Sequence, residues 1–259
     1  MLSVFTDSNL SFPEIIINVC VFLVSLVFSL SIHEFMHGYA AYKCGDSTAK
    51  RMGRLSFKPG AHIDPVGMLM MLLVGFGWAK PVPINPSEMT RFKNKNTAVR
   101  IVSLAGVGSN FVVAFLAYFL FWLVWLIAFS SGSYIDAFSS GYGIPFRIPL
   151  SQSFSQVLLT IFLVLLLEIF QRNLMFMAFN LIPIPPLDGY HFLETFLPRS
   201  IRPKFNNLAR YSSIIFILLV VMGRGGVNIL GVLVNWIATP FLYIIQLPVD
   251  ALIRLFGLT

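Results

Sequence analysis

The stretch IIINVCVFLVSLVFSLSIHEFMHGYA, residues 15–40, decides how the chain must fold, because a long apolar run in it ends in two histidines and a glutamate. Pro13 suits the first turn of a helix and Gly45 suits the end of one, so we expect a helix from about Glu14 to Lys43. A helix of that length can cross a lipid bilayer. A carboxylate in lipid is costly, so Glu34 requires either a structural partner or a chemical task.

The composition excludes an ordinary soluble globular domain. Of the 259 residues, 57% are hydrophobic and 11% are charged, and the mean hydropathy is +0.81. The chain carries a formal net charge of +7, from 18 Lys and Arg against 11 Asp and Glu. These basic residues lie in short loops between apolar segments, where they set membrane orientation. We therefore expect a polytopic membrane protein embedded in the lipid bilayer, with no nucleic-acid partner.

The distribution of basic residues predicts the side of the membrane on which each loop lies. The residues before Glu14 contain no lysine or arginine, whereas residues 43–58 contain several. By the positive-inside rule, the histidine-bearing end of the first helix is cytoplasmic and the N-terminus is outside. Two more spanning helices are expected, from about Thr97 to Phe129 and from about Phe154 to Phe179, with the loop between them outside.

The apolar segment from Val66 to Trp78 is too short to cross the membrane. As a helix it would reach roughly 20 Å, against a hydrocarbon core of about 30 Å. Both of its flanks are basic, so we expect it to enter and leave the membrane on the cytoplasmic side. Around it, the alternation at Leu55–Phe57 and the prolines near Val82–Ile84 predict short edge strands.

The C-terminal region is less determined. Two apolar stretches, Tyr211 to Met222 and Val227 to Leu247, could cross once or twice or lie partly in the interface. The predicted fold is an all-α polytopic membrane protein, with about four to six transmembrane helices and a short re-entrant or β element between the first two spanning helices. We expect a single integral-membrane domain over residues 1–259, with a functional core at about 14–196 and membrane-associated helices at about 209–259.

Two histidines in HEFMH have the spacing of metal ligands. His33 and His37 are four residues apart, so on a helix they project from one face and can share one tetrahedral Zn²⁺. Glu34 lies one step round the helix, where it can act on a water at the metal without being a ligand. That is the position of a general base in zinc-dependent peptide hydrolysis. A catalytic zinc site has three protein ligands, so the third must come from elsewhere in the chain.

Two carboxylates are candidates for the third ligand. Glu168 lies in the middle of a predicted spanning helix, whereas Asp188 follows NLIPIPP at the cytoplasmic end of that helix, at the level of His33. The prolines of this segment break the helix, which lets the Asp188 carboxylate turn inward. Asp188 is therefore the favoured ligand. The loop histidines His62 and His191 are expected to be solvated rather than to bind the metal.

Three motifs follow one another along the chain: HEFMH in the first helix, LAGVGSN in the second and NLIPIPPLDG at the end of the third. Together they resemble the motifs of the site-2 protease family, the intramembrane zinc metalloproteases of peptidase family M50. The resemblance extends from about Phe22 to Phe196. The family often has proline where this chain has Val107, and many members carry a PDZ or CBS domain that is absent here, so the sequence resembles a minimal form.

The resemblance implies functional roles for particular residues. One zinc ion per chain would be bound, and the three ligands and the water-activating base would be His33, His37, Asp188 and Glu34. Two asparagines would position the substrate or stabilise the oxyanion: Asn180, which opens the third motif, and Asn110 in the second. From the residues alone, these asparagines could equally pack helices together or cap backbone groups.

The expected function is hydrolysis of a peptide bond within or near a transmembrane segment of another membrane protein, near the cytoplasmic side of a bacterial plasma membrane. A helical substrate shields its carbonyls and must unwind, and the strands expected near Leu55–Phe57 and Val82–Ile84 would hold it extended. The alternative is a catalytically inactive zinc-binding scaffold or a metal transporter. A transporter would be expected to show an internal repeat, which the sequence lacks. A regulatory partner and a homo-oligomer are both left open.

Overall fold

Four helices are long and apolar enough to cross a membrane within the part of the chain that the structure describes. They are α2 (Phe12–Cys44), α5 (Lys95–Ser130), α6 (Phe154–Asn180) and α10 (Ile229–Leu255). The structure is a computed structural model, and it describes residues 11–74, 77–130, 153–198, 200–211, 214–215, 218–219, 222–223, 226 and 228–255. The predicted all-α membrane architecture is confirmed.

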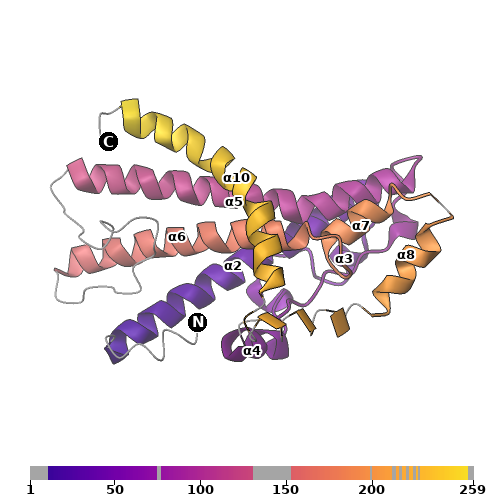
Figure 1. Cartoon of the computed structure of the whole chain (residues 1–259), viewed down its shortest axis with the longest axis horizontal. Coiled ribbons are helices and arrows are strands. Elements are labelled where there is room, and N and C mark those ends of the chain that lie inside the picture. Colours follow the sequence, from indigo (N-terminus) through magenta and orange to yellow (C-terminus); the bar gives the residue numbers. More distant parts are fainter. Residues whose placement is uncertain are drawn as a thin grey trace.

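Shorter helices connect the long ones. They are α3 (Thr48–Arg51), η1 (Pro59–Ala61), α4 (Pro65–Val74), η2 (Pro86–Glu88), α7 (Asp188–Glu194) and α8 (Arg202–Ala209). In Figure 1, α3, α7 and α8 gather at one end of the bundle, where α2 ends and α5 begins. The segments that follow the first and third predicted spans therefore meet at the same end.

Helix α2 begins and ends close to its predicted bounds. At its start, the backbone N–H and the hydroxyl of Ser11 donate to Glu14 Oε2 over 2.7 and 2.6 Å, which caps the first turn. At its end, Gly45 has a φ of 113° and its N–H donates to the Tyr42 carbonyl. Only glycine adopts that left-handed backbone at low cost, which explains why the helix stops there.

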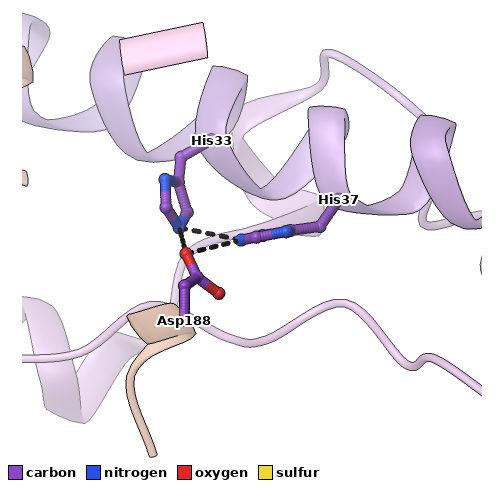
Figure 2. Close-up of side chains that lie close together, drawn as sticks. All are labelled: His33, His37 and Asp188. Carbon is purple, nitrogen blue, oxygen red and sulfur yellow. Dashed lines mark hydrogen bonds and ion pairs between the residues drawn. The ribbon is translucent and has the colours of Figure 1, made fainter. Parts of the chain in front are cut away.

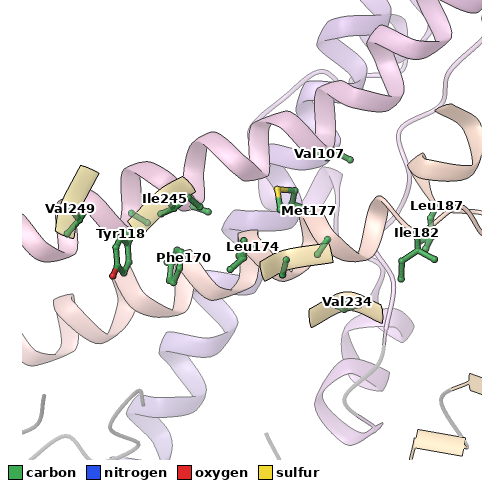
Figure 3. Close-up of a cluster of buried hydrophobic side chains, with 14 residues drawn as sticks. Val107, Tyr118, Phe170, Leu174, Met177, Ile182, Leu187, Val234, Ile245 and Val249 are labelled. Carbon is green, nitrogen blue, oxygen red and sulfur yellow. The ribbon is translucent and has the colours of Figure 1, made fainter. Parts of the chain in front are cut away.

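The long helices pack through small side chains and several apolar clusters, the largest of which joins α5, α6 and α10. Helix α5 lies against α2 and α6, and α10 lies across α5 and α6 (Figure 1). Tyr118, Phe170 and Ile245 contribute to the cluster from α5, α6 and α10 respectively (Figure 3). Because lipid tails are as apolar as leucine, helices associate in a membrane through close van der Waals packing. Ala114 and Ala178, both fully buried, allow that close approach.

Helix α6 carries an ion pair in its apolar span. Arg172 donates to Glu168 Oε2 from Nη2 and Nε, over 2.5 and 2.9 Å, and the two residues are one helical turn apart. The guanidinium carbon of Arg172 also lies 4.6 Å from the centre of the Phe22 ring on α2. Glu168, the rejected candidate for the third metal ligand, is therefore neutralised within its own helix.

The segment between α2 and α5 differs from its prediction. Helix α4 has ten residues and is not among the four helices able to span, in agreement with the short apolar segment expected there. The strands expected at Leu55–Phe57 and Val82–Ile84 are not formed, and both stretches are irregular. At Val82–Ile84, the backbone N–H groups that a strand would need are missing or already bonded elsewhere. Pro81 and Pro83 have no N–H, and the N–H groups of Val82 and Asn85 donate to carboxylates instead of to a neighbouring strand.

At the C-terminus, α10 runs unbroken through Pro240 and Pro248 and covers the second of the two apolar stretches left open by the sequence. Half of the first stretch, residues 211–222, lies outside the described residues. The domain boundaries remain a prediction.

Candidate metal centre

Three potential ligand atoms converge at the end of the bundle where α2 meets α7. The Nε2 atoms of His33 and His37 are 3.0 Å apart, and they lie 3.4 and 3.2 Å from Asp188 Oδ2. Both imidazoles, one turn apart on α2, point toward the carboxylate, which comes from the first residue of α7 (Figure 2). His33 and His37 are buried, and Asp188 is nearly so. The trio predicted from the sequence is brought together.

A glycine lets α7 approach the end of α6. After α6 ends at Asn180, the chain turns and α7 begins at Asp188, with Leu187 buried at its start. A Cβ on Gly189 would overlap the backbone carbonyl oxygens of Leu181 and Ile182. The glycine of the DG pair is therefore needed for close packing of α7, and this packing aims the Asp188 carboxylate at α2.

A second glycine makes room for the two imidazole rings. Gly106, the glycine of LAGVGSN, lies on α5 so close to α2 that a Cβ there would overlap the rings of both His33 and His37. The next residue, Val107, is buried in the apolar cluster of Figure 3, and α5 continues through it as a helix. The motif therefore positions α5 against the histidines even though the frequent proline is absent.

The proton of His37 is assigned by a backbone carbonyl. His37 Nδ1 lies 2.8 Å from the Val102 carbonyl oxygen on α5. A carbonyl can only accept a hydrogen bond, so Nδ1 carries the hydrogen and the neutral ring leaves a lone pair on Nε2. That lone pair faces Asp188.

The proton of His33 is assigned by a chain of buried amides. Asn173 Nδ2 on α6 donates to the Ile169 carbonyl and to Ser29 Oγ, both over 2.7 Å, so its Oδ1 faces away from them. That oxygen accepts from Asn110 Nδ2 over 2.7 Å, which turns Asn110 Oδ1 toward His33 Nδ1, 2.6 Å away. His33 Nδ1 is therefore the donor, and its Nε2 also presents a lone pair to Asp188.

This arrangement of lone pairs fits a cation. Asp188 Oδ2 is buried and makes no hydrogen bond among the described residues, because the two imidazole nitrogens that face it present lone pairs instead of hydrogens. Three unprotonated donor atoms repel one another unless a positive ion lies between them. Two imidazole nitrogens and one carboxylate oxygen form a ligand set that suits Zn²⁺ with one position left open.

A cavity of about 610 Å³ opens beside this centre. His33, Glu34 and Asn180 line it, together with apolar side chains of α4 and α6 such as Met68 and Phe176. Asn180 Nδ2 donates to the Phe176 carbonyl over 3.0 Å. The position of Asn180 suits the predicted contact with substrate, because it lies in the same cavity as the candidate base.

The other predicted asparagine lies in a different environment. Asn110 has no exposed surface, and both ends of its amide are used within the bundle, by His33 and by Asn173. It is placed to orient a ligand rather than to contact substrate. Asn173 was missed by the sequence reasoning, although a polar residue in an apolar helix is itself a signal.

One histidine prediction is wrong. His62 is only 1% exposed and lines the cavity, with Nε2 2.6 Å from the Ser56 carbonyl oxygen, whereas solvation was expected. It is buried because the irregular segments on either side of α4 fold against each other, which no local pattern reveals. His191 is exposed, as expected.

The chain is similar to known proteins over most of its length. Residues 21–222 match the model of peptidase family M50. YwhC of Bacillus subtilis (strain 168) is 39% identical over 203 residues, which cover 78% of this chain and 81% of YwhC. Rip2 of Mycolicibacterium smegmatis is 28% identical over 174 residues, which cover 65% of this chain and 54% of Rip2. Both names assign these relatives provisionally to the zinc metalloproteases. No solved structure matches the chain.

Proposed function

The chain belongs to peptidase family M50, and on that basis we propose that it hydrolyses a peptide bond within or near a transmembrane segment of a membrane protein substrate. The observation that carries the proposal is the convergence of His33, His37 and Asp188, beside a cavity that His33 and Glu34 line, in a bundle of helices able to span a membrane. The family and its zinc metalloprotease relatives support this chemistry.

His33, His37 and Asp188 would hold one zinc ion per chain. When bound, zinc supplies a Lewis acid that polarises the scissile carbonyl and makes a water more acidic. Glu34 takes a proton from the attacking water and delivers it to the leaving amine. Asn180, which lines the same cavity as Glu34, would orient the substrate backbone, and Asn110 would hold His33 in the tautomer that leaves Nε2 free.

The charges of the loops support a particular membrane side for this site. The chain leaves α2 through a basic segment, and the N-terminal residues before α2 contain no base. This asymmetry supports a cytoplasmic position for the metal centre and an outside N-terminus. Bacterial relatives support a bacterial plasma membrane as the location.

An inactive zinc-binding scaffold or a metal transporter is the competing function. Glu34 argues against both, because it lies in the cavity beside the ligands without belonging to the ligand cluster. A site that only binds metal does not need such a carboxylate.

The test compares wild type, Glu34→Gln and Asp188→Ala, purified in detergent, by zinc content and by cleavage of a panel of single-span membrane proteins. Wild type should hold about one zinc and cleave. Glu34→Gln should keep its zinc and lose about 100-fold or more in kcat, as expected for a general base. Asp188→Ala should bind zinc weakly. If Glu34→Gln cleaves like wild type, the protease assignment fails.

A further inference from the structure

The candidate base is held by a backbone amide from outside the helix bundle. The Val82 N–H donates to Glu34 Oε2 over 2.9 Å. Val82 lies in KPVPIN, between Pro81 and Pro83, and proline has no N–H. The Val82 N–H is thus the only backbone donor between Lys80 and Ile84, and it donates to Glu34.

Several bonds fix the segment that carries Val82. Arg54 Nη2 donates to the carbonyl oxygens of Lys80 and Pro81 over 2.6 and 3.1 Å. The Lys80 N–H donates to the His62 carbonyl over 2.9 Å. These bonds attach the residues just before Val82 to the irregular segment that precedes α4.

The residues after Val82 are attached to the turn that follows α2. The Asn85 N–H donates to Asp46 Oδ2 over 2.6 Å, and Asp46 Oδ1 accepts from the Thr48 N–H over 2.9 Å. Asp46 is 1% exposed, so this attachment is buried. Segment 80–85 is therefore held on both sides of Val82.

The side chain of Val82 also fixes its position on α2. It is buried, and a Cβ placed on Gly38 would lie 3.2 Å from Val82 Cγ1. Gly38 is one turn beyond Glu34 on the same helix, so Val82 packs on α2 directly beside the carboxylate that it binds.

We propose that Val82 is a positioning residue for the general base, an inference that rests on the proposed function. Its N–H holds one oxygen of the Glu34 carboxylate in a charge-assisted hydrogen bond and leaves the other oxygen to take the proton from water. A glutamate side chain otherwise rotates freely, and small misplacement of a base is costly to the rate. The flanking prolines keep this segment from donating any other amide there.

The test uses variants that differ in whether residue 82 has an N–H. Val82→Ala and Val82→Ile keep the donor and change only the side chain, so they measure what the packing of Val82 contributes to kcat. Val82→Pro removes the donor and should lower kcat by about 10- to 100-fold, the range for losing one bond to a charged group, with KM and zinc content unchanged.

A double-mutant comparison separates positioning from simple damage to the fold. Glu34→Asp has a shorter side chain that loses contact with Val82, so adding Val82→Pro to it should lower kcat by less than about threefold further. If Val82→Pro cleaves as well as Val82→Ala, the proposal is overturned.

The remaining outcomes are also decisive. Loss of zinc from Val82→Pro, or a full additional drop in the Glu34→Asp background, would show that Val82 supports the fold rather than the base. That result would leave the proposed function intact. A wild type that binds zinc and cleaves nothing would overturn both inferences.

Discussion

The metal ligands and the base of this site are held in two different ways. His33 and His37 are oriented by two buried groups of the neighbouring helix α5, the amide of Asn110 and the carbonyl of Val102. Glu34, next to His33 in sequence, is oriented by the main chain of an irregular segment through Val82. Adjacent residues on one helix thus depend on separate parts of the molecule. Substitutions near the histidines should therefore change metal affinity, whereas substitutions near Val82 should change turnover.

The largest effect is expected where α5 touches the ligands. Gly106→Ala places a methyl group inside the volume of both imidazole rings, so the histidines must move apart and the zinc site should be lost. Zinc affinity should fall by about 100-fold or more, and cleavage should fall with it. Titration with a competing chelator measures this.

Gly108→Ala is the matched control for that change. It adds the same methyl group two residues further along α5, where a Cβ would meet nothing within 4 Å. Its zinc affinity should equal that of wild type. Equal affinities for wild type and Gly106→Ala would contradict the close approach of α5 to the ligands.

A smaller loss of zinc affinity is expected when the hydrogen-bonded chain from Asn173 through Asn110 to His33 is broken. Asn173→Leu removes the group that fixes the orientation of Asn110, so His33 loses its preference for the tautomer with a free Nε2. Substitutions that disturb the partners of metal ligands typically weaken binding by about 10- to 100-fold. The competing-chelator titration applies here as well.

Thr160→Val serves as the control, because it also removes a buried polar group from α6, but one whose hydroxyl, among the described residues, bonds only to the Gln156 carbonyl. It should leave zinc affinity unchanged. If Thr160→Val and Asn173→Leu weaken zinc binding equally, general destabilisation of α6 explains both.

The smallest effect is expected from a change to the segment that holds the base Glu34. Arg54→Met removes two bonds to the segment that carries Val82 but leaves the Val82 N–H in place. We expect kcat to fall by about three- to tenfold, with zinc affinity unchanged, because the segment keeps its other attachments. Steady-state kinetics with zinc analysis on the same samples measures both.

Arg51→Met provides the comparison. Arg51 pairs with Glu88 at the surface, over 2.7 Å, and exposed pairs of this kind contribute little. Its kcat should stay within about twofold of wild type. A drop in zinc affinity for Arg54→Met would show that the segment carrying Val82 supports the metal ligands as well as Glu34.

The metal ligands could be predicted from the sequence, whereas the contacts of the irregular segments could not. The first three spans and the convergence of His33, His37 and Asp188 were predictable from apolar runs, helical spacing, loop charges and the three motifs. The fourth span, α10, was left open. The contacts of Val82 and the burial of His62 were not, since a main-chain N–H has no side-chain signature and both depend on how two irregular segments meet.

The role of Asn110 shows an intermediate case. The motif marked the residue, and the sequence allowed either a substrate contact or a packing role. Only the direction of the amide, traced from the Ile169 carbonyl through Asn173, shows that it faces His33. Two strands were wrongly expected because PVPIN was interpreted as an edge, whereas its Val82 and Asn85 amides are donated to Glu34 and Asp46.

The pair formed by Glu168 and Arg172 bears on how the protein is made. Both charges belong to one turn of α6, so the helix neutralises them by itself and needs no neighbour to do so as it leaves the insertion machinery. The contact of Arg172 with Phe22 then becomes available only when α6 reaches α2. Entry of α6 into the lipid and its docking in the bundle are therefore separable stages of biogenesis.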